Sequence, residues 1–288
     1  MSEKTKALRA MINAPGSVIA PCAYDCLSLR AIELAGFKVA GTSGYGMHGA
    51  MLGSPDNGLL AFNEMVAALG KMADSSSIPV MADAEGGYGN ALSVIRTVRE
   101  FEKAGIAGLF IEDQKLPPNC PFIKQTEQIS VSEMVGKIQA ALDTRQDPDF
   151  IIVARTDAPF EESVRRANLY LEAGADMVKV LPKTKEEFLA YPKLINGPIH
   201  MGLYAGKGIN DGMDAKAVEE MSEGKYKILT FPMTGLYSAT AALIDAMNYI
   251  AKNGTDEGYQ GKVLAGPQYQ KFIGVDKYKA DLEKYVRE

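Results

Sequence analysis

Short apolar segments alternate with longer segments of helical periodicity along most of the chain. The short segments have no polar face, and this pattern is typical of strands buried on both sides in a parallel sheet. The expected strands are 18–22, 38–43, 79–83, 108–112, 150–154, 177–181, 199–204 and 227–232. The expected amphipathic helices are 26–35, 60–75, 91–104, 130–145, 161–173, 184–195, 214–222 and 235–252.

The repeated strand–helix unit predicts an α/β fold, a (β/α)8 TIM barrel. Eight such units in about 250 residues are what this barrel requires. A doubly wound sheet more often has five or six strands and a Gly-x-Gly-x-x-Gly sequence after the first strand. Three expected helices also end alike, with a glycine that supplies the left-handed residue before the next strand. These ends are Ala35-Gly36, Ala104-Gly105 and Ala173-Gly174.

No segment has the composition of a linker, so we expect residues 1–288 to form a single barrel domain. Residues 266–288 lie beyond the eighth unit and are expected to form a C-terminal helical extension. Its apolar and aromatic side chains pack either on another subunit or on its own barrel. These side chains are Tyr269, Phe272, Tyr278, Leu282 and Tyr285.

Composition narrows the class of protein and its partners. With 47% hydrophobic and 23% charged residues, the chain is typical of a globular protein. A net charge of −5 and the lack of long Lys/Arg runs argue against nucleic acid as a partner. No apolar run approaches the roughly 20 residues that span a bilayer, and the first residues lack a signal-peptide core. We therefore predict a cytoplasmic protein without a membrane partner.

The residue types available for chemistry favour carboxylates and a metal ion. Cys22, Cys26 and Cys120 are too few and too irregularly spaced for a disulfide framework or a zinc site. One of them could still be a working thiol. Only two histidines are present, His48 and His200.

The segment after the third expected strand concentrates this chemistry. Asp83 and Glu85 are two residues apart, so on an extended chain both point toward the same volume. The glycines within 86–89 let backbone or ligand approach closely. Hard oxygen ligands with an open approach suit Mg²⁺ holding an anionic substrate. The alternative is that both acids are turn formers and caps of the next helix.

Ionisable and polar residues also follow other strands, and in a TIM barrel these strand ends meet at the active site. Burying so many unpaired ionisable groups would cost several kcal/mol each, and a metal with an anion would pair them. The groups are Tyr24-Asp25, Ser43-Gly44-Tyr45-Gly46, Pro55-Asp56-Asn57, Glu112-Asp113-Gln114 and Arg155-Thr156-Asp157.

At these residues the chain resembles the isocitrate lyase and phosphoenolpyruvate mutase superfamily, over residues 15 to about 180. The resemblance implies that Asp83 ligates Mg²⁺, with Mn²⁺ as an alternative, and that Glu85 and Glu112 hold its water shell. It implies that Ser43, Gly44, Tyr45 and Arg155 bind the carboxylates of a 2-keto or 2-hydroxy acid. The matching motifs are Ala23-Tyr24-Asp25, Thr42-Ser43-Gly44, Pro55-Asp56, residues 83–89, Ile111-Glu112-Asp113-Gln114 and Ala154-Arg155-Thr156-Asp157.

The chain departs from the superfamily in its gating loop. Lyases of the superfamily read Lys-Lys/Arg-Cys-Gly-His there, whereas this loop reads Pro-Pro-Asn-Cys-Pro-Phe over residues 117–122. Without a neighbouring Lys or His, the Cys120 thiol should stay protonated near neutral pH and serve as a general acid. The alternative is an incidental cysteine. A smaller departure is Glu85, where the superfamily usually has Asp.

The last three strand ends lack the polar residues with which the lyases hold the far end of a larger acid. An isocitrate-type tricarboxylate is therefore not expected, although the same loss could mean that catalysis has decayed. Lys179 and Lys207 either supply new positive charge or are solvated. The aligned segments are Leu181-Pro182, Gly202-Leu203-Tyr204 and Thr234-Gly235-Leu236-Tyr237.

We therefore predict a Mg²⁺-dependent carbon–carbon lyase that acts on a small 2-hydroxy or 2-keto acid through an enolate. Cys120, Tyr24 or Tyr45 would move the proton at the carbanion centre. One alternative is a phosphonopyruvate- or phosphoenolpyruvate-type mutase or hydrolase, in which Asp56 is the nucleophile or orienting group. Another is a non-catalytic relative that retains the metal site. The resemblance also implies a homo-oligomer, a dimer or tetramer.

Overall fold

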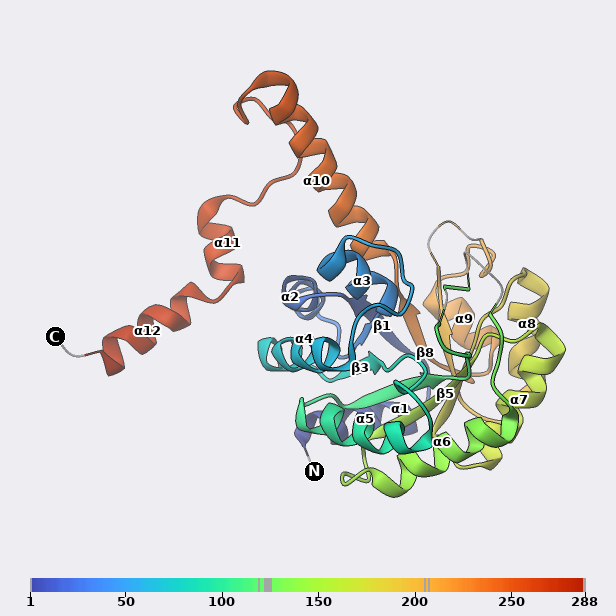
Figure 1. Cartoon of the computed structure of the whole chain (residues 1–288). Helices are drawn as coiled ribbons and strands as arrows, with labels where there is room; N and C mark the ends of the chain where they lie inside the picture. Colours follow the sequence, from blue (N-terminus) through green and yellow to red (C-terminus); the bar gives the residue numbers. More distant parts are fainter. Residues whose placement is uncertain (1, 119, 122–125, 205, 207, 287–288) are drawn as a thin grey trace. The chain divides into compact units, whose positions relative to one another are not determined.

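The computed structural model describes residues 2–118, 120–121, 126–204, 206 and 208–286. Its strands close into a parallel barrel in sequence order, with β1 paired to β8 (Figure 1). The predicted (β/α)8 TIM barrel is thus confirmed. The strands are β1 (Val18–Ala23), β2 (Ala40–Thr42), β3 (Val80–Asp83), β4 (Gly108–Glu112), β5 (Ile151–Thr156), β6 (Met177–Val180), β7 (Ile199–Gly202) and β8 (Tyr226–Phe231).

The helices of the barrel follow the predicted periodicity, with two additions. Helix α1 (Glu3–Asn13) precedes the first strand, and helix α3 (Gly44–Leu52) occupies a segment expected to be a loop. The remaining helices that connect the strands are α2 (Cys26–Leu34), α4 (Phe62–Ser75), α5 (Ala91–Lys103), α6 (Val131–Thr144), α7 (Phe160–Glu172), α8 (Lys185–Leu194) and α9 (Ala215–Met221).

Helix α3 was missed because its residues do not form an amphipathic pattern. Glycine disfavours a helix interior, and this segment contains three glycines among nine residues. The helix nevertheless begins at a capping serine, Ser43, and ends at Gly53 in the left-handed conformation, with φ of 61°. Met47 and His48 are buried on its inner side, so tertiary packing outweighs propensity here.

Two apolar clusters fix the position of the pocket. The larger fills the layer between the strands and the surrounding helices. The smaller lies inside the barrel, where Met81, Phe110 and Ile228 pack together with Leu8 and Ile12 of α1. Because α1 and these side chains fill the amino-terminal end of the barrel, space for a ligand remains at the carboxyl ends of the strands.

The chain divides into two compact units, Met1–Leu236 with the barrel and Tyr237–Glu288. The second unit contains most of α10 (Thr234–Asn253), with α11 (Gly266–Phe272) and α12 (Val275–Tyr285). That residues 1–288 make one domain stays a prediction. Among the described residues, no helix combines the length and apolar character needed to cross a membrane.

Candidate active site

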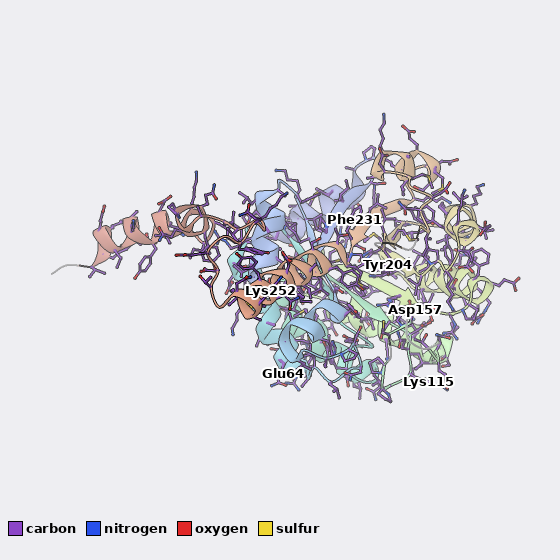
Figure 2. All side chains as sticks on the ribbon, turned by 90° about the horizontal axis from the view of Figure 1, so that it is seen from above. Glu64, Lys115, Asp157, Tyr204, Phe231 and Lys252 are labelled. Atoms are coloured by element: carbon purple, nitrogen blue, oxygen red, sulfur yellow. The ribbon has the colours of Figure 1, made fainter. Side chains whose placement is uncertain are left out.

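A pocket lies at the carboxyl ends of the strands, in the barrel unit. Figure 2 labels two residues of this region, Tyr204 after β7 and Asp157 after β5. Six of the residues predicted for the site line the pocket, together with residues that were not predicted. The lining residues are Cys22, Thr42, Ser43, Tyr45, Asp56, Asp83, Phe110, Cys120, Pro121, Arg155, Lys179, Tyr204, Pro232 and Met233.

Asp83 is held in place by backbone donors on both sides. Its Oδ2 accepts from the Gly44 amide at 3.1 Å, and its Oδ1 accepts from the Glu85 amide at 3.0 Å. Its own amide donates to Thr42 Oγ1 on β2. This carboxylate at the end of β3 is therefore oriented before any ligand arrives.

Glu85 is the most strained acid of the site. Its backbone has a φ of 50°, a conformation that costs a non-glycine residue about 1–2 kcal/mol. Two hydrogen bonds hold it there, because its amide donates to Asp83 and its carbonyl accepts from the Glu112 amide at 2.9 Å. Glu85 Oε1 is buried and has no hydrogen-bond partner in the described part of the chain. An acceptor in this state is suited to a cation.

The acids of the site repel one another. Burial, followed by the charges of Asp83, Glu112 and Asp56, raises the pKa of Glu85 well above its ordinary value. Burial also raises the pKa of Glu112 to about 8, although the Arg155 guanidinium opposes this shift. Desolvation and neighbouring carboxylates therefore both favour the protonated acids when no cation is bound.

Arg155 lines the pocket and is paired with carboxylates. Its Nε and Nη2 donate to the two carboxylate oxygens of Asp157 at 3.0 and 2.7 Å, and its Nη1 lies 3.3 Å from Glu112 Oε2. Gln114 Nε2 donates to both Glu112 and Asp157, which closes a ring of four side chains. Asp157 thus occupies the edge of the guanidinium that a substrate carboxylate would need for two parallel hydrogen bonds.

The amino end of α3 faces the acids. Ser43 caps this helix, with its hydroxyl accepting from the Gly46 amide at 3.3 Å, and both Ser43 and Tyr45 line the pocket. Gly44 is required by space, because a Cβ there would lie 2.6 Å from Glu85 Oε1 and 3.0 Å from Asp83 Oδ2. The Gly44 amide already donates to Asp83, so it serves the acidic cluster in this structure.

Asp56 and His48 form a pair beside the cluster. His48 Nδ1 lies 2.9 Å from the Gly44 carbonyl and 3.4 Å from Asp56 Oδ1, while the Leu60 amide donates to His48 Nε2. Because the Leu60 amide donates to Nε2, Nε2 is the acceptor of the ring and Nδ1 is the donor, toward the Gly44 carbonyl. His48 lies on α3 and is completely buried, so it is not a solvated loop residue.

His48, Asp56 and Glu85 each offer an atom within 4.8 Å of the others, a spacing at which a metal ion can be shared. Both nitrogens of His48 are already used in hydrogen bonds. We therefore regard the carboxylates as the better ligands, with Asp83 beside them.

The proposed proton donors differ in position. Cys120 is buried and lines the pocket. Tyr45 also lines the pocket and is partly buried. Tyr24 is partly buried, burial raises its pKa, and in the described part of the chain it is not among the lining residues. Asn119 and Lys207 lie outside the described residues, as do residues 122–125 of the gating loop.

Sequence reasoning assigned no role to three residues that the site uses. Asp157 and Gln114 belong to motifs noted in the sequence, but their partners became visible only in the folded barrel. Lys137 of α6 is buried and donates to the Gly86 carbonyl at 2.8 Å, which anchors the loop after β3. A lysine on the apolar side of an amphipathic helix was the signal available for it.

Comparisons with known proteins agree with this geometry. The profile of the phosphoenolpyruvate phosphomutase family matches residues 8–221. The chain is 35% identical to the 2,3-dimethylmalate lyase of Eubacterium barkeri, over 97% of both chains. It is 34% identical to the 2-methylisocitrate lyase of Aeropyrum pernix, over 96% of this chain and 89% of that one.

A solved phosphonopyruvate hydrolase in complex with oxalate and Mg²⁺ has a TM-score of 0.89 and 27% identity, and it covers 99% of this chain and 100% of its own. The relatives and the fold therefore point to the same group of enzymes. The chain belongs to the phosphoenolpyruvate mutase/isocitrate lyase superfamily.

Proposed function

We propose that this protein is a carbon–carbon lyase that binds a divalent cation, Mg²⁺ or Mn²⁺, and cleaves a small 2-hydroxy or 2-keto carboxylic acid through an enolate. The observation that carries the proposal is the cluster of buried acids beside the pocket, which contains more carboxylates than its cations balance. Glu85 Oε1 lacks a partner in the described part of the chain, and the pKa values of Glu85 and Glu112 are raised by burial and mutual repulsion.

The residues present fit a divalent cation. All the candidate ligands are carboxylates, which Mg²⁺ and Mn²⁺ prefer. Asp83 would ligate the ion directly, because backbone donors orient it at the strand end. Glu85 and Glu112 would hold the water shell, and Asp56 extends the acidic cluster toward the pocket. A bound cation would stabilise the negative charge that develops on the enolate oxygen.

The chain's own groups would orient the acid and move its proton. Ser43 and Tyr45, at the amino end of α3, would receive a substrate carboxylate near the positive end of the helix dipole. Arg155, at the centre of the ring with Asp157 and Glu112, would keep these acids placed and add positive charge to the pocket. Cys120 would hold the proton that is exchanged with the carbanion centre.

The test is cleavage of candidate acids by the purified protein. We expect turnover of a 2-alkylmalate-type acid, followed by release of its keto-acid product, that requires Mg²⁺ and stops when the ion is chelated. Asp83→Ala should abolish both turnover and Mg²⁺-dependent thermal stabilisation while the circular dichroism spectrum stays unchanged. A wild-type protein that is indifferent to Mg²⁺ in both measurements would contradict the proposal.

A second function is favoured by the position of Asp56. This acid lines the pocket, and burial, followed by the charge of Asp83, raises its pKa. In a phosphonopyruvate-type mutase or hydrolase it would be the nucleophile or orienting group. Release of phosphate, or formation of phosphoenolpyruvate, from phosphonopyruvate in the same assay would select this function, and Asp56→Asn should abolish either.

We also propose that the chain forms a homo-oligomer, a dimer or a tetramer. Helix α10 has exposed apolar side chains at positions that share one face of a helix. These are Leu243, Ile244, Met247 and Ile250. A contiguous apolar face of this kind is typical of a contact with another protein surface, and a second copy is always available.

A further inference from the structure

Two cations line the pocket in the described part of the chain, Arg155 and Lys179, and they differ in their partners. Arg155 makes salt bridges to Asp157 and Glu112 at 2.7 and 3.3 Å. The Lys179 ammonium makes no salt bridge with the residues that the structure describes. It lies over the face of the Phe110 ring, 3.9 Å from the centroid.

The acids whose charges act on Lys179 are Asp83 and Asp157, but neither makes a salt bridge with it in the described part of the chain, and Asp157 is already paired with Arg155. Two further neighbours carry no charge. Burial raises the pKa of the Cys22 thiol to about 12, so this side chain is uncharged near neutral pH. His200 on β7 is paired in register with Lys179, and burial, followed by the charge of Lys179, lowers its pKa well below the ordinary value. Its Nδ1 is buried without a hydrogen-bond partner among the described residues. Both neighbours are therefore neutral.

The charged Lys179 ammonium lowers the stability of the folded protein, because burial removes part of its hydration. Burial, followed by the charge of Arg155, lowers the pKa of Lys179 to about 8. A contact with an aromatic face recovers only part of the lost hydration. An anion that enters the pocket could contact the ammonium and offset this loss of hydration, because Lys179 is one of the lining residues.

Lys179 lies across the pocket from the proposed direct metal ligand. It belongs to β6, whereas Asp83 ends β3, and two strands separate β6 from β3 in the closed barrel. Both side chains line the same pocket. A ligand that reaches from Asp83 to Lys179 needs one polar group at the metal and an anionic group at its other end.

We propose that Lys179 is a specificity-determining residue that binds the second carboxylate of a dicarboxylic 2-hydroxy or 2-keto acid. This inference rests on the proposed function, which supplies the first carboxylate and its contacts at the cation. Arg155 cannot offer a paired edge for the second carboxylate while Asp157 occupies its Nε and Nη2. Lys179 binds it as a point charge.

The experiment compares a dicarboxylate with a monocarboxylate that shares its 2-hydroxy acid end. Malate and lactate are titrated calorimetrically into the protein at saturating Mg²⁺. We expect wild-type protein to bind malate more tightly than lactate, by on the order of ten- to a hundredfold, the range for a hydrogen bond to a charged group. Lys179→Met should remove this preference and change lactate affinity by less than about threefold.

The matched control is Lys183→Met, which removes an exposed lysine shortly after the same strand. It should keep the preference for malate, because an exposed charge is screened by solvent. Lys179→Met should fold normally and melt no lower than wild type without ligand, since methionine fills the same space without a buried charge.

The outcomes separate the two proposals. Binding of both acids that does not depend on Mg²⁺ would overturn the proposed function. A preference for malate that survives Lys179→Met, or that is equally lost in Lys183→Met, would overturn the role of Lys179. So would a wild type that does not distinguish the two acids. A covalent adduct with pyruvate, trapped by borohydride on Lys179, would also overturn it, because the lysine would then be a nucleophile.

Discussion

At the scale of single residues, the site depends on which neighbour along a strand points inward. Glu112 ends β4 and belongs to the acids of the site, where it contacts Arg155. Asp113 is the next residue and lies on the other side of the barrel wall, where Arg166 and Tyr170 of α7 donate to its Oδ2 at 2.9 and 2.7 Å. Two adjacent acids therefore have separate partners, Arg155 inside the barrel for Glu112 and helix α7 outside it for Asp113.

Glu85→Gln tests the uncompensated carboxylate. The amide keeps the size of the side chain but removes a charge that Asp83 and Glu112 repel. We expect the metal-free variant to be more stable by roughly 1 kcal/mol, a rise of about 2–4 °C in melting temperature for a domain of this size. Its affinity for Mg²⁺ should fall by about ten- to a hundredfold.

Both quantities can be measured by differential scanning calorimetry and Mg²⁺ titration. The matched control is Glu172→Gln, which changes an exposed acid at the end of α7. It should leave Mg²⁺ affinity unchanged. A Glu85→Gln protein with wild-type affinity for Mg²⁺ would exclude Glu85 from the metal site.

Cys120 is the second residue with a specific expectation. If it is the general acid, Cys120→Ser and Cys120→Ala should both lower turnover by roughly a hundredfold, the loss expected for an acid–base group. The substrate KM should change little, because the thiol acts on the proton in the transition state. Cys26→Ala is the control, since this half-buried cysteine is not one of the residues that line the pocket. Full turnover in both Cys120 variants would transfer the role to Tyr45 or Tyr24.

At the scale of elements, α7 is fastened to the barrel by its charged residues. Arg166 donates to Asp113 and to the Ile129 carbonyl from one nitrogen, and its Nε donates to Glu162 at 2.7 Å. Arg165 makes a second pair with Glu162. Glu162, in the first turn of α7, thus links an exposed ion pair to one that is buried, and it also complements the helix dipole.

The free energy of unfolding should differ between wild type and Glu162→Gln by an amount that depends on pH. Hydrogen bonds from Arg165 and Arg166 lower the pKa of Glu162 to about 2. Because the folded-state pKa is below that of the unfolded chain, the stabilisation is fully present above about pH 4.5 and is lost as the pH falls toward 2. The exposed position limits it to roughly 0.3–1 kcal/mol.

We therefore expect urea unfolding to give a less stable Glu162→Gln protein at pH 7 and a shrinking difference from wild type between pH 5 and pH 3. Glu161→Gln, one residue earlier in the same helix turn, is the matched control. A difference between wild type and Glu162→Gln that stays constant over this pH range would contradict the assignment.

At the scale of the whole molecule, the unit Tyr237–Glu288 lacks the buried core of the barrel unit. None of the residues of α10, α11 and α12 is buried. Apolar side chains that remain exposed in this number favour association with further protein surface. The expectation of a dimer or tetramer belongs to this scale.

Light scattering during gel filtration should therefore give a mass of two or four times the 31.0 kDa of one chain. Replacing Ile244 and Met247 by Glu should shift the protein toward the monomer, because a charge in an apolar contact is costly. Replacing exposed Lys252 of the same helix by Glu is the control. A monomeric wild type at micromolar concentration would contradict the expectation.

Sequence alone determined the barrel and much of its site. The barrel was predictable because buried parallel strands and amphipathic helices each leave a local pattern, and the pattern repeated eight times. Asp83, Glu112 and Arg155 could be placed at one end for the same reason, since parallel strands all end at the same edge of a closed barrel. Which strand ends are neighbours at that edge follows from the order of the strands in the barrel, and this order is the order of the strands along the chain.

The tertiary structure determined which side chains pair with one another and which ionisable groups are desolvated. Helix α3 forms against its glycine content because Met47 and His48 are buried by distant segments, and no local signal records such packing. That Arg155 binds a substrate carboxylate stays a prediction; only the folded barrel shows that Asp157 also contacts its guanidinium. Sequence left open whether Lys179 supplies positive charge or is solvated, because its desolvation beside Phe110 depends on residues from five other strands that line the same pocket. Local patterns determine elements, whereas desolvation and pairing arise only when distant elements meet.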